Sequence, residues 1–245
     1  DSRYFHPDNG VRIEGIRKYL DSLQLDPVLR AIGLVSLMEA ADRVDSTTGV
    51  QMAYLKKWAP RALKPLSLRV PEMLPGRGEA TRLDAAEAAS LPADLVYMDP
   101  PYNQHDYHSN YHLWETLICG DEPEVYGVAR KRIDCKTHKS PFNSKRKIAA
   151  AMSAVVKACK SPYMVVSFNN EGFLGREEIE AMLLQKGKIE VFSLDHPRYV
   201  GSRIGIYNPK GKKVGKISHT RNKELLFVVA PEAADLVRVR KIMAS

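Results

Sequence analysis

The chain has 245 residues, 44% of them hydrophobic, and lysine plus arginine outnumber aspartate plus glutamate by 37 to 29. This content is enough for one sizeable globular domain with an appended lobe, and the net charge of +8 suits either a polyanionic partner or simple solubility. No apolar run approaches 18 residues, no signal-peptide pattern opens the chain, and the three cysteines form no CxxC pair. We therefore expect a cytoplasmic protein with free thiols and no membrane partner.

The first part of the chain has helical periodicity. A helix is predicted over residues 8–23, with its cap at Asp8 or Asn9, and another over residues 26–44, which begins at an Asp-Pro cap pair. The pattern of residues 49–58 predicts a third, shorter helix. Prolines and glycines between residues 60 and 80 indicate an extended connector. We expect a helical region over residues 1–75 and an α/β domain over residues 76–245.

Strands and helices alternate in the second part. Strands are predicted at 93–98, 163–170, 188–196 and 223–230, and helices at 108–117, 145–159 and 175–187. Alternation of this kind predicts an open, mostly parallel α/β sheet. The last two strands have no helix between them, so they are expected to pair antiparallel. Ligands of such sheets bind at the carboxyl ends of the strands.

The first of these strands ends in Asp-Pro-Pro-Tyr, residues 99–102. Pro100 and Pro101 cannot donate to a sheet ladder and have a fixed φ, so they impose a rigid loop. The residue before a proline is held extended, which orients Asp99. The Asp99 carboxylate, a backbone carbonyl and the Tyr102 ring then suit a planar ring that carries an NH₂ group. The alternative is a turn with no function.

Three stretches carry a resemblance to a known family: DPPYNQHDYHSNYHLWETL from Asp99, VVSFNNEG from Val165 and HPRYVGSRIGIYNPKGKKVGK from His196. They resemble the D12-type, S-adenosylmethionine-dependent N6-adenine DNA methyltransferases of restriction-modification systems. The resemblance implies a Rossmann-like class I methyltransferase sheet, S-adenosylmethionine as cofactor, double-stranded DNA as substrate and a cognate restriction endonuclease as partner. It makes residues 1–75 a candidate target-recognition element. The implied catalytic residues are Asp99, Pro100, Pro101 and Tyr102.

The implied mechanism follows from the chemistry of the adenine amine. Its lone pair is delocalised into the ring, and acceptance of both N–H bonds by Asp99 and the Pro100 carbonyl makes that lone pair available. A duplex adenine must first be flipped out of the stack, and Tyr102 would then stack on it.

The cofactor site is sparsely represented. A glycine-rich turn after the first strand and an acidic residue on the next are expected, and neither is found, so we expect the first strands of the sheet to lie upstream of Asp1. By resemblance, Asp84 matches the acidic residue that binds the adenine amino group of the cofactor. A helix cap before the following AAEAA is an equal alternative.

Two basic runs are candidate DNA contacts, although such runs are often only solvated faces. The residues selected are Arg130, Lys131, Arg132, Lys139, Lys145, Arg146, Lys147, Arg203, Lys212 and Lys213. Such side chains neutralise phosphates and make affinity dependent on salt.

No metal is expected. His105, His108 and His112 could share a helix face at ligand-like spacing, but methyl transfer needs no metal and no carboxylates or cysteines cluster near them in the sequence. Two alternative functions stay open beside DNA adenine methylation. One is methylation of an adenine or guanine amino group in RNA, and the other is an inactive nucleic-acid-binding fragment without its cofactor-binding half.

Overall fold

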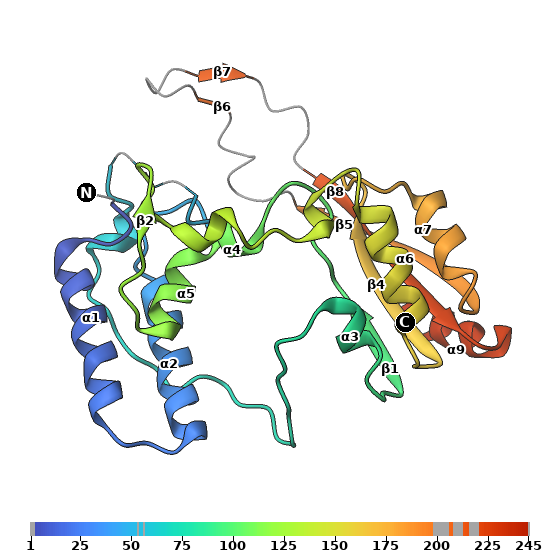
Figure 1. The fold of residues 1–245 in the computed structure, drawn as a ribbon, viewed down its shortest axis with the longest axis horizontal. Coiled ribbons are helices and arrows are strands. Elements are labelled where there is room, and N and C mark those ends of the chain that lie inside the picture. The colour runs from blue at the N-terminus through green and yellow to red at the C-terminus, as the bar shows by residue number, and fades with distance from the viewer. Residues whose placement is uncertain are drawn as a thin grey trace. The chain divides into compact units, whose positions relative to one another are not determined.

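A computed structural model describes residues 3–52, 54–55, 57–197, 206–207, 213–215 and 221–244 (Figure 1). The chain divides into two compact units, the first made of residues 1–77 and 107–139 and the second of residues 78–106 and 140–245. The predicted domain boundary lies near residue 75, and the chain first passes from one unit to the other after residue 77. That prediction assigns residues 107–139 to the second domain, whereas in the structure they belong to the first unit. No helix within these described ranges is long and apolar enough to span a membrane.

The first unit opens with two helices, α1 (Pro7–Ser22) and α2 (Pro27–Asp42), as predicted. The Asp26 side chain caps α2 by accepting from the amides of Val28 and Leu29, at 3.0 and 3.2 Å. Proline occupies a first-turn position in both helices, where its missing N–H is not needed.

The predicted helix at 49–58 is wrong. Gly49 has a φ of 95°, which a right-handed helix cannot accommodate, and its amide donates to Thr47 Oγ1 at 3.0 Å. Thr47 pairs with Tyr54 in an isolated antiparallel bridge. The chain then enters a short 3₁₀ helix, η1 (Pro60–Leu63), and an extended connector, as predicted.

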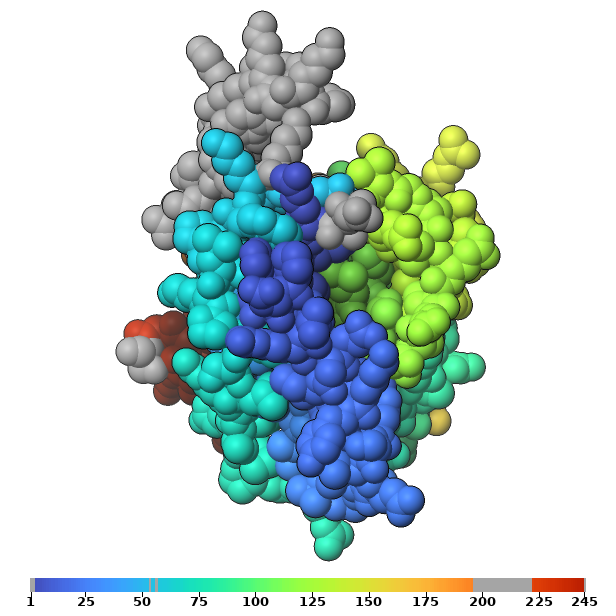
Figure 2. All heavy atoms as spheres, turned by 90° about the vertical axis from the view of Figure 1, so that its left-hand side faces the viewer, coloured from blue at the N-terminus to red at the C-terminus, as the bar shows by residue number. Residues whose placement is uncertain are grey.

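The second segment of this unit begins with α4 (Tyr107–Asn110) and α5 (His112–Cys119). The sequence predicted one helix here, but it is interrupted at Tyr111, whose φ of −124° is not helical. Leu117 of α5 packs with Leu37 and Ala41 of α2 in a small core. Figure 2 shows this segment in green beside the blue N-terminal helices. Burial of the apolar face of α5 explains why the segment joins the first unit.

Arg17 of α1 fixes the end of α5. Its guanidinium donates to the carbonyls of Leu117 and Ile118 at 2.6 and 3.2 Å, and Gly120 ends the helix at a φ of 65°. A cation that satisfies the last carbonyls stabilises the carboxyl end of a helix. A short hairpin follows, formed by β2 (Val125–Tyr126) and β3 (Lys131–Arg132), and leads into η2 (Ile133–Lys136).

The second unit contains a four-stranded sheet in the order β1-β4-β8-β5. Its strands are β1 (Leu95–Met98), β4 (Tyr163–Asn169), β8 (Arg221–Ala230) and β5 (Lys188–Pro197). The predicted antiparallel pairing of the last two strands is confirmed. However, β8 lies between β4 and β5 and runs antiparallel to both, so only β1 and β4 form a parallel pair. The sheet is therefore mixed rather than mostly parallel in its pairings.

Helices cover both faces of this sheet (Figure 1). They are α3 (Ala85–Ala89), η3 (Pro141–Asn143), α6 (Ile148–Ala158), α7 (Arg176–Leu183) and α9 (Ala233–Met243). The main core holds Met152 of α6, Ile179 of α7, and Val166 and Phe227 of the sheet, all buried. The strand residues that alternate with these face α9, as the hydrogen bonds Tyr163–Asp235 at 3.1 Å and Arg240–Glu190 at 2.6 Å show.

Two further short strands, β6 (Ile206–Tyr207) and β7 (Lys213–Gly215), pair antiparallel.

Candidate active site

The Asp-Pro-Pro-Tyr loop leaves the sheet at the carboxyl end of β1, as the sequence predicts. Met98 is buried in the sheet, Asp99 is exposed to solvent, and Pro100 is buried again. The Tyr102 ring meets Phe168 of β4 edge to face, with ring centroids 5.8 Å apart and planes at 61°. Because Phe168 is only 1% exposed, its ring is held by close packing and restricts the positions that the Tyr102 ring can take.

Hydrogen bonds to its backbone carbonyls hold the rest of the loop. The amide of Phe173 donates to the Tyr102 carbonyl at 2.8 Å. The Asn143 side chain of η3 donates to the carbonyls of Asn103 and His105, at 2.8 and 2.9 Å. The loop is thus tied to segments 40 and 71 residues away along the chain, which gives it one preorganised shape. Sequence reasoning missed Asn143, because its role depends on contacts that no local pattern records.

A second carboxylate lies near Asp99. Glu224 of β8 accepts from Ser167 Oγ at 2.6 Å and from Asn169 Nδ2 at 3.3 Å, both on the adjacent strand β4. Desolvation and then the negative charge of Glu224 raise the pKa of Asp99 above its ordinary value. This polar end of the sheet lies on the face opposite the main core. The resemblance contained the stretch with Ser167 and Asn169, but it assigned neither them nor Glu224 a role.

The turn that follows β4 requires a glycine. A Cβ on Gly172 would lie 2.3 Å from Cε1 of Phe168 and 3.1 Å from the Asn169 carbonyl. Phe168 is the residue that supports Tyr102, so the close approach at Gly172 is part of the site's geometry.

Comparisons of this chain with known proteins show its family. The model of the D12 class of N6 adenine-specific DNA methyltransferases matches residues 3–182. The chain belongs to this D12 class. It is 33% identical to the type II methyltransferase M.FokI of Planomicrobium okeanokoites over 199 residues, 78% of this chain and 30% of the relative. It is 29% identical to the modification methylase StsI of Streptococcus sanguinis over 214 residues, 83% of this chain and 33% of the relative.

A third relative is matched over more of its own length. The type II methyltransferase M.NlaIII of Neisseria lactamica is 26% identical over 231 residues, 91% of this chain and 68% of the relative. By contrast, the D12 chain spans only about a third of the length of M.FokI and of StsI. The comparison with solved structures found no match to it.

In this D12 chain, Asp84 is the N-cap of α3. Its Oδ1 accepts from the amide of Ala86 at 2.9 Å, and the residue is exposed. The capping alternative is therefore what the structure shows. The predicted contact with the cofactor adenine stays a prediction.

The predicted DNA contacts of the D12 chain divide into groups. Arg130, Lys139, Lys145, Arg146 and Lys147 are exposed and Lys131 is partly exposed. Arg203 and Lys212 lie outside the described residues, and only the backbone of Lys213 is described.

The prediction is wrong for Arg132, which is only 7% exposed. Its guanidinium donates to both oxygens of Asp121 at 2.7 and 2.8 Å and to Asp134 at 3.0 Å. Two bound carboxylates already satisfy this cation, so it is not available to a phosphate.

The spacing of His105, His108 and His112 would let them share a helix face, but they lie in different segments: His105 precedes α4, His108 lies in α4 and His112 begins α5. His112 is 1% exposed and hydrogen-bonds the Gln51 carbonyl at 3.0 Å, and burial lowers its pKa. His108 instead bonds Oδ1 of Asp134 at 3.0 Å. Although burial opposes it, hydrogen bonds from Arg132 and His108 lower the pKa of Asp134 to about 2. The sequence argument considered only neighbours along the chain, whereas the fold brings Asp134 to His108 from 26 residues further along.

Proposed function

We propose that this chain carries the base-handling half of a site-specific DNA adenine-N6 methyltransferase. The observation that supports this proposal most directly is the loop of residues 99–102 at the carboxyl end of β1, with the Tyr102 ring fixed against Phe168 at 5.8 Å. A flipped-out adenine stacks on Tyr102, a contact that contributes about 1–3 kcal/mol per base. Its N6 amine donates one hydrogen bond to Asp99 and one to the Pro100 carbonyl.

Both hydrogen bonds serve the chemistry. They hold the N6 nitrogen in a pyramidal geometry with its lone pair directed at the methyl donor, and they stabilise the positive charge that develops on nitrogen. The amine loses its proton only after the methyl group has been transferred. The raised pKa of Asp99, caused by desolvation and by Glu224, makes it a better acceptor for that proton.

S-Adenosylmethionine is the proposed methyl donor, and when bound it supplies an electrophilic methyl group on a sulfonium. Asp84 is the described residue that we assign to such a site, and one residue is a partial fit. The open edge of the sheet supports a further contribution. Of the described strands, β1 pairs only with β4, and its Leu95 and Tyr97 are 54% and 61% exposed. In our proposal the sheet is Rossmann-like, and strands from outside these 245 residues pair with β1 and bring the glycine-rich turn.

Duplex DNA is the proposed substrate, and the exposed basic residues are its phosphate contacts. Lys145, Arg146 and Lys147 precede α6, whose first turn contains no acidic residue. A helix N-terminus favours anions, so three cations in this place destabilise the isolated helix and suit a bound phosphate. Target recognition by residues 1–75 and a cognate restriction endonuclease as partner belong to the same proposal.

The test uses the protein at its natural length, expressed in cells whose DNA contains no N6-methyladenine. Mass spectrometry of digested nucleic acids is expected to find N6-methyladenine in DNA. Asp99→Ala is expected to lower the methylation rate by about 10²–10³ or more. Asp94→Ala, an exposed carboxylate just before β1, is the matched control and is expected to change nothing. Methylated bases in RNA alone, or none in either nucleic acid from a folded protein, would overturn the proposal.

A further inference from the structure

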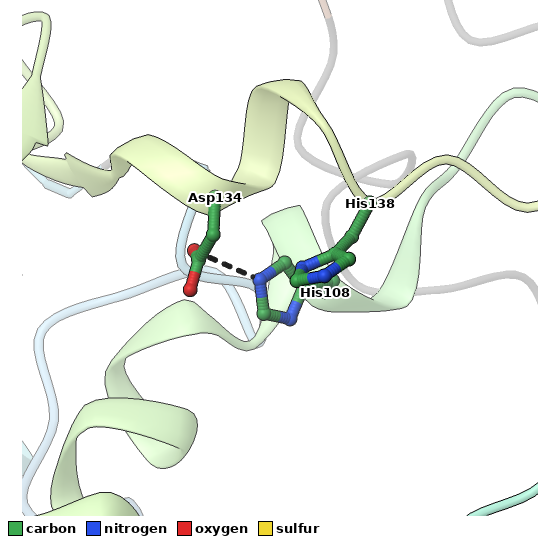
Figure 3. A group of neighbouring side chains, drawn as sticks. All are labelled: His108, Asp134 and His138. Atoms are coloured by element: carbon green, nitrogen blue, oxygen red, sulfur yellow. Dashed lines mark hydrogen bonds and ion pairs between the residues drawn. The ribbon is translucent and has the colours of Figure 1, made fainter.

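Three potential metal ligands meet in the first unit. They are His108 of α4, Asp134 of η2 and His138 just after η2 (Figure 3). One ligand atom from each residue lies within 4.8 Å of the other two. Nε2 of His108 and Oδ1 of Asp134 are already only 3.0 Å apart.

The turn between Asp134 and His138 brings their side chains together. The amides of Thr137 and His138 both donate to the Asp134 carbonyl, at 3.0 and 2.9 Å, so the chain makes one tight turn between the two ligands. The ring of His138 stands nearly perpendicular to that of His108, with centroids 5.4 Å apart and planes at 87°. A hydrogen-bonded turn thus fixes the backbone that carries two of the three ligands, and the side chain of the third is bonded to one of them.

The charges around the cluster are compatible with a cation. Arg132 is the nearest described cation, and a lone guanidinium would repel a metal ion. Both oxygens of Asp121 accept from it, however, at 2.7 and 2.8 Å. Asp134 Oδ2 also accepts from Arg132, at 3.0 Å. The two carboxylates together outweigh the single positive charge of Arg132 and leave one net negative charge to balance a divalent ion.

We propose that His108, Asp134 and His138 bind a divalent transition-metal ion, with Zn²⁺ as the best match. Imidazole nitrogen and carboxylate oxygen are ligands that zinc accepts at about 2.0–2.2 Å, which places tetrahedral ligand atoms about 3.3 Å apart. The His108–Asp134 separation fits this value, and His138 needs to move by only about 1–1.5 Å. His138 is exposed, so its side chain can make this movement and solvent can supply the remaining ligand.

The ion has a structural role in this proposal. It joins α4, which follows residues 99–106 in the chain, to the turn between the basic residues Arg132 and Lys139. Mg²⁺ and Ca²⁺ prefer sites made of oxygen, so they are not expected to bind here. The inference does not depend on the proposed methyl transfer.

The experiment is calorimetric titration of the purified chain with Zn²⁺ at neutral pH under reducing conditions, together with thermal unfolding with and without the ion. We expect one ion bound per chain and a higher unfolding temperature with Zn²⁺ but not with Mg²⁺. His138→Gln is the main variant, because an exposed side chain can be replaced without loss of the fold. It is expected to weaken Zn²⁺ binding by more than about tenfold and to abolish the rise in unfolding temperature.

Two controls separate this site from others. His105→Gln changes an exposed histidine outside the cluster, and Cys119→Ser removes an exposed thiol that can bind zinc by itself. Both are expected to bind Zn²⁺ like the unmodified chain. In addition, Co²⁺ is expected to develop the intense visible absorption of a tetrahedral site in the unmodified chain but not in His138→Gln. Absence of Zn²⁺ binding, or equal binding by His138→Gln and His105→Gln, would overturn the proposal.

Discussion

Gly172→Ala tests whether the turn after β4 controls the position of Tyr102. The new Cβ would lie 2.3 Å from Cε1 of Phe168, about 1 Å closer than ordinary van der Waals contact allows, and 3.1 Å from the Asn169 carbonyl. Phe168 is 1% exposed and packed in the main core, so its ring cannot rotate away freely. Overpacking of this kind typically costs about 1–3 kcal/mol. We expect the free energy of unfolding to fall by that amount.

The same substitution is expected to lower activity. A shifted Phe168 no longer holds the Tyr102 ring at its present position, and a misplacement of about 1 Å at a reacting centre can cost about 10²-fold in rate. The assays are urea unfolding of the chain and steady-state methyl transfer by the protein at its natural length. Gly15→Ala is the matched control. It lies inside α1 with no atom within 4 Å of the added Cβ, and it is expected to stabilise the protein by up to about 1 kcal/mol without changing the rate.

Two results would refute this reasoning. If Gly172→Ala unfolds like the unmodified chain, the core around Phe168 has room that the structure does not show. If stability falls but the rate stays unchanged, Phe168 does not control Tyr102.

Three further predictions concern charged residues. Asp99→Asn is expected to abolish methyl transfer and yet to raise the free energy of unfolding at pH 7, because desolvation and Glu224 raise the pKa of Asp99 and disfavour its charge. Denaturation at several pH values should show this gain disappearing as pH falls below about 3.9, where the unfolded carboxyl is also protonated. Arg130 lies in the β2–β3 hairpin loop with a φ of 49°, so Arg130→Gly should change the free energy of unfolding by no more than about 1 kcal/mol. The slope of log affinity for duplex DNA against log salt concentration should become shallower by about 0.9, and an unchanged slope would remove Arg130 from the DNA contacts. Arg132→Ala should destabilise the chain by about 1.5–3 kcal/mol at pH 7. Despite burial, hydrogen bonds lower the pKa of Asp134 to about 2, so the stabilisation by the Arg132–Asp134 pair disappears as pH falls from about 4 to 2. A destabilisation by Arg132→Ala that stays constant down to pH 2 would contradict the role of this pair.

The sequence predicts those features of this protein that depend on local chemistry. The exit of β1 through Asp99–Tyr102 was predictable because proline restricts its own backbone and that of its neighbour. The helices α1, α2, α6 and α7 were predictable from apolar spacing and caps. The helix at 49–58 was not correctly predicted, because the left-handed Gly49 and the bridge between Thr47 and Tyr54 override a weak periodicity.

Features that depend on distant partners could not be predicted. Nothing in the sequence around Arg132 distinguishes it from the partly exposed Lys131, and only the fold shows two carboxylates around its side chain. The insertion of β8 between β4 and β5 is likewise a property of the whole sheet. It sets Glu224 beside Ser167, 57 residues away in the chain, and so creates the second carboxylate of the candidate site.

The interleaved course of the chain through the two units has a consequence for synthesis on the ribosome. The first unit closes through bonds such as Arg17–Leu117 and Tyr4–Ala129, which span 100 and 125 residues. The first bond cannot form until Leu117 has emerged and the second until Ala129 has emerged, and closure of such long loops is slow. Residues 78–106, with the whole Asp99–Tyr102 loop, are therefore made while the N-terminal helices still lack their partners. A premature stop before residue 107 would leave the apolar face of α2 without Leu117, so we expect truncated products to aggregate rather than to persist as half-enzymes.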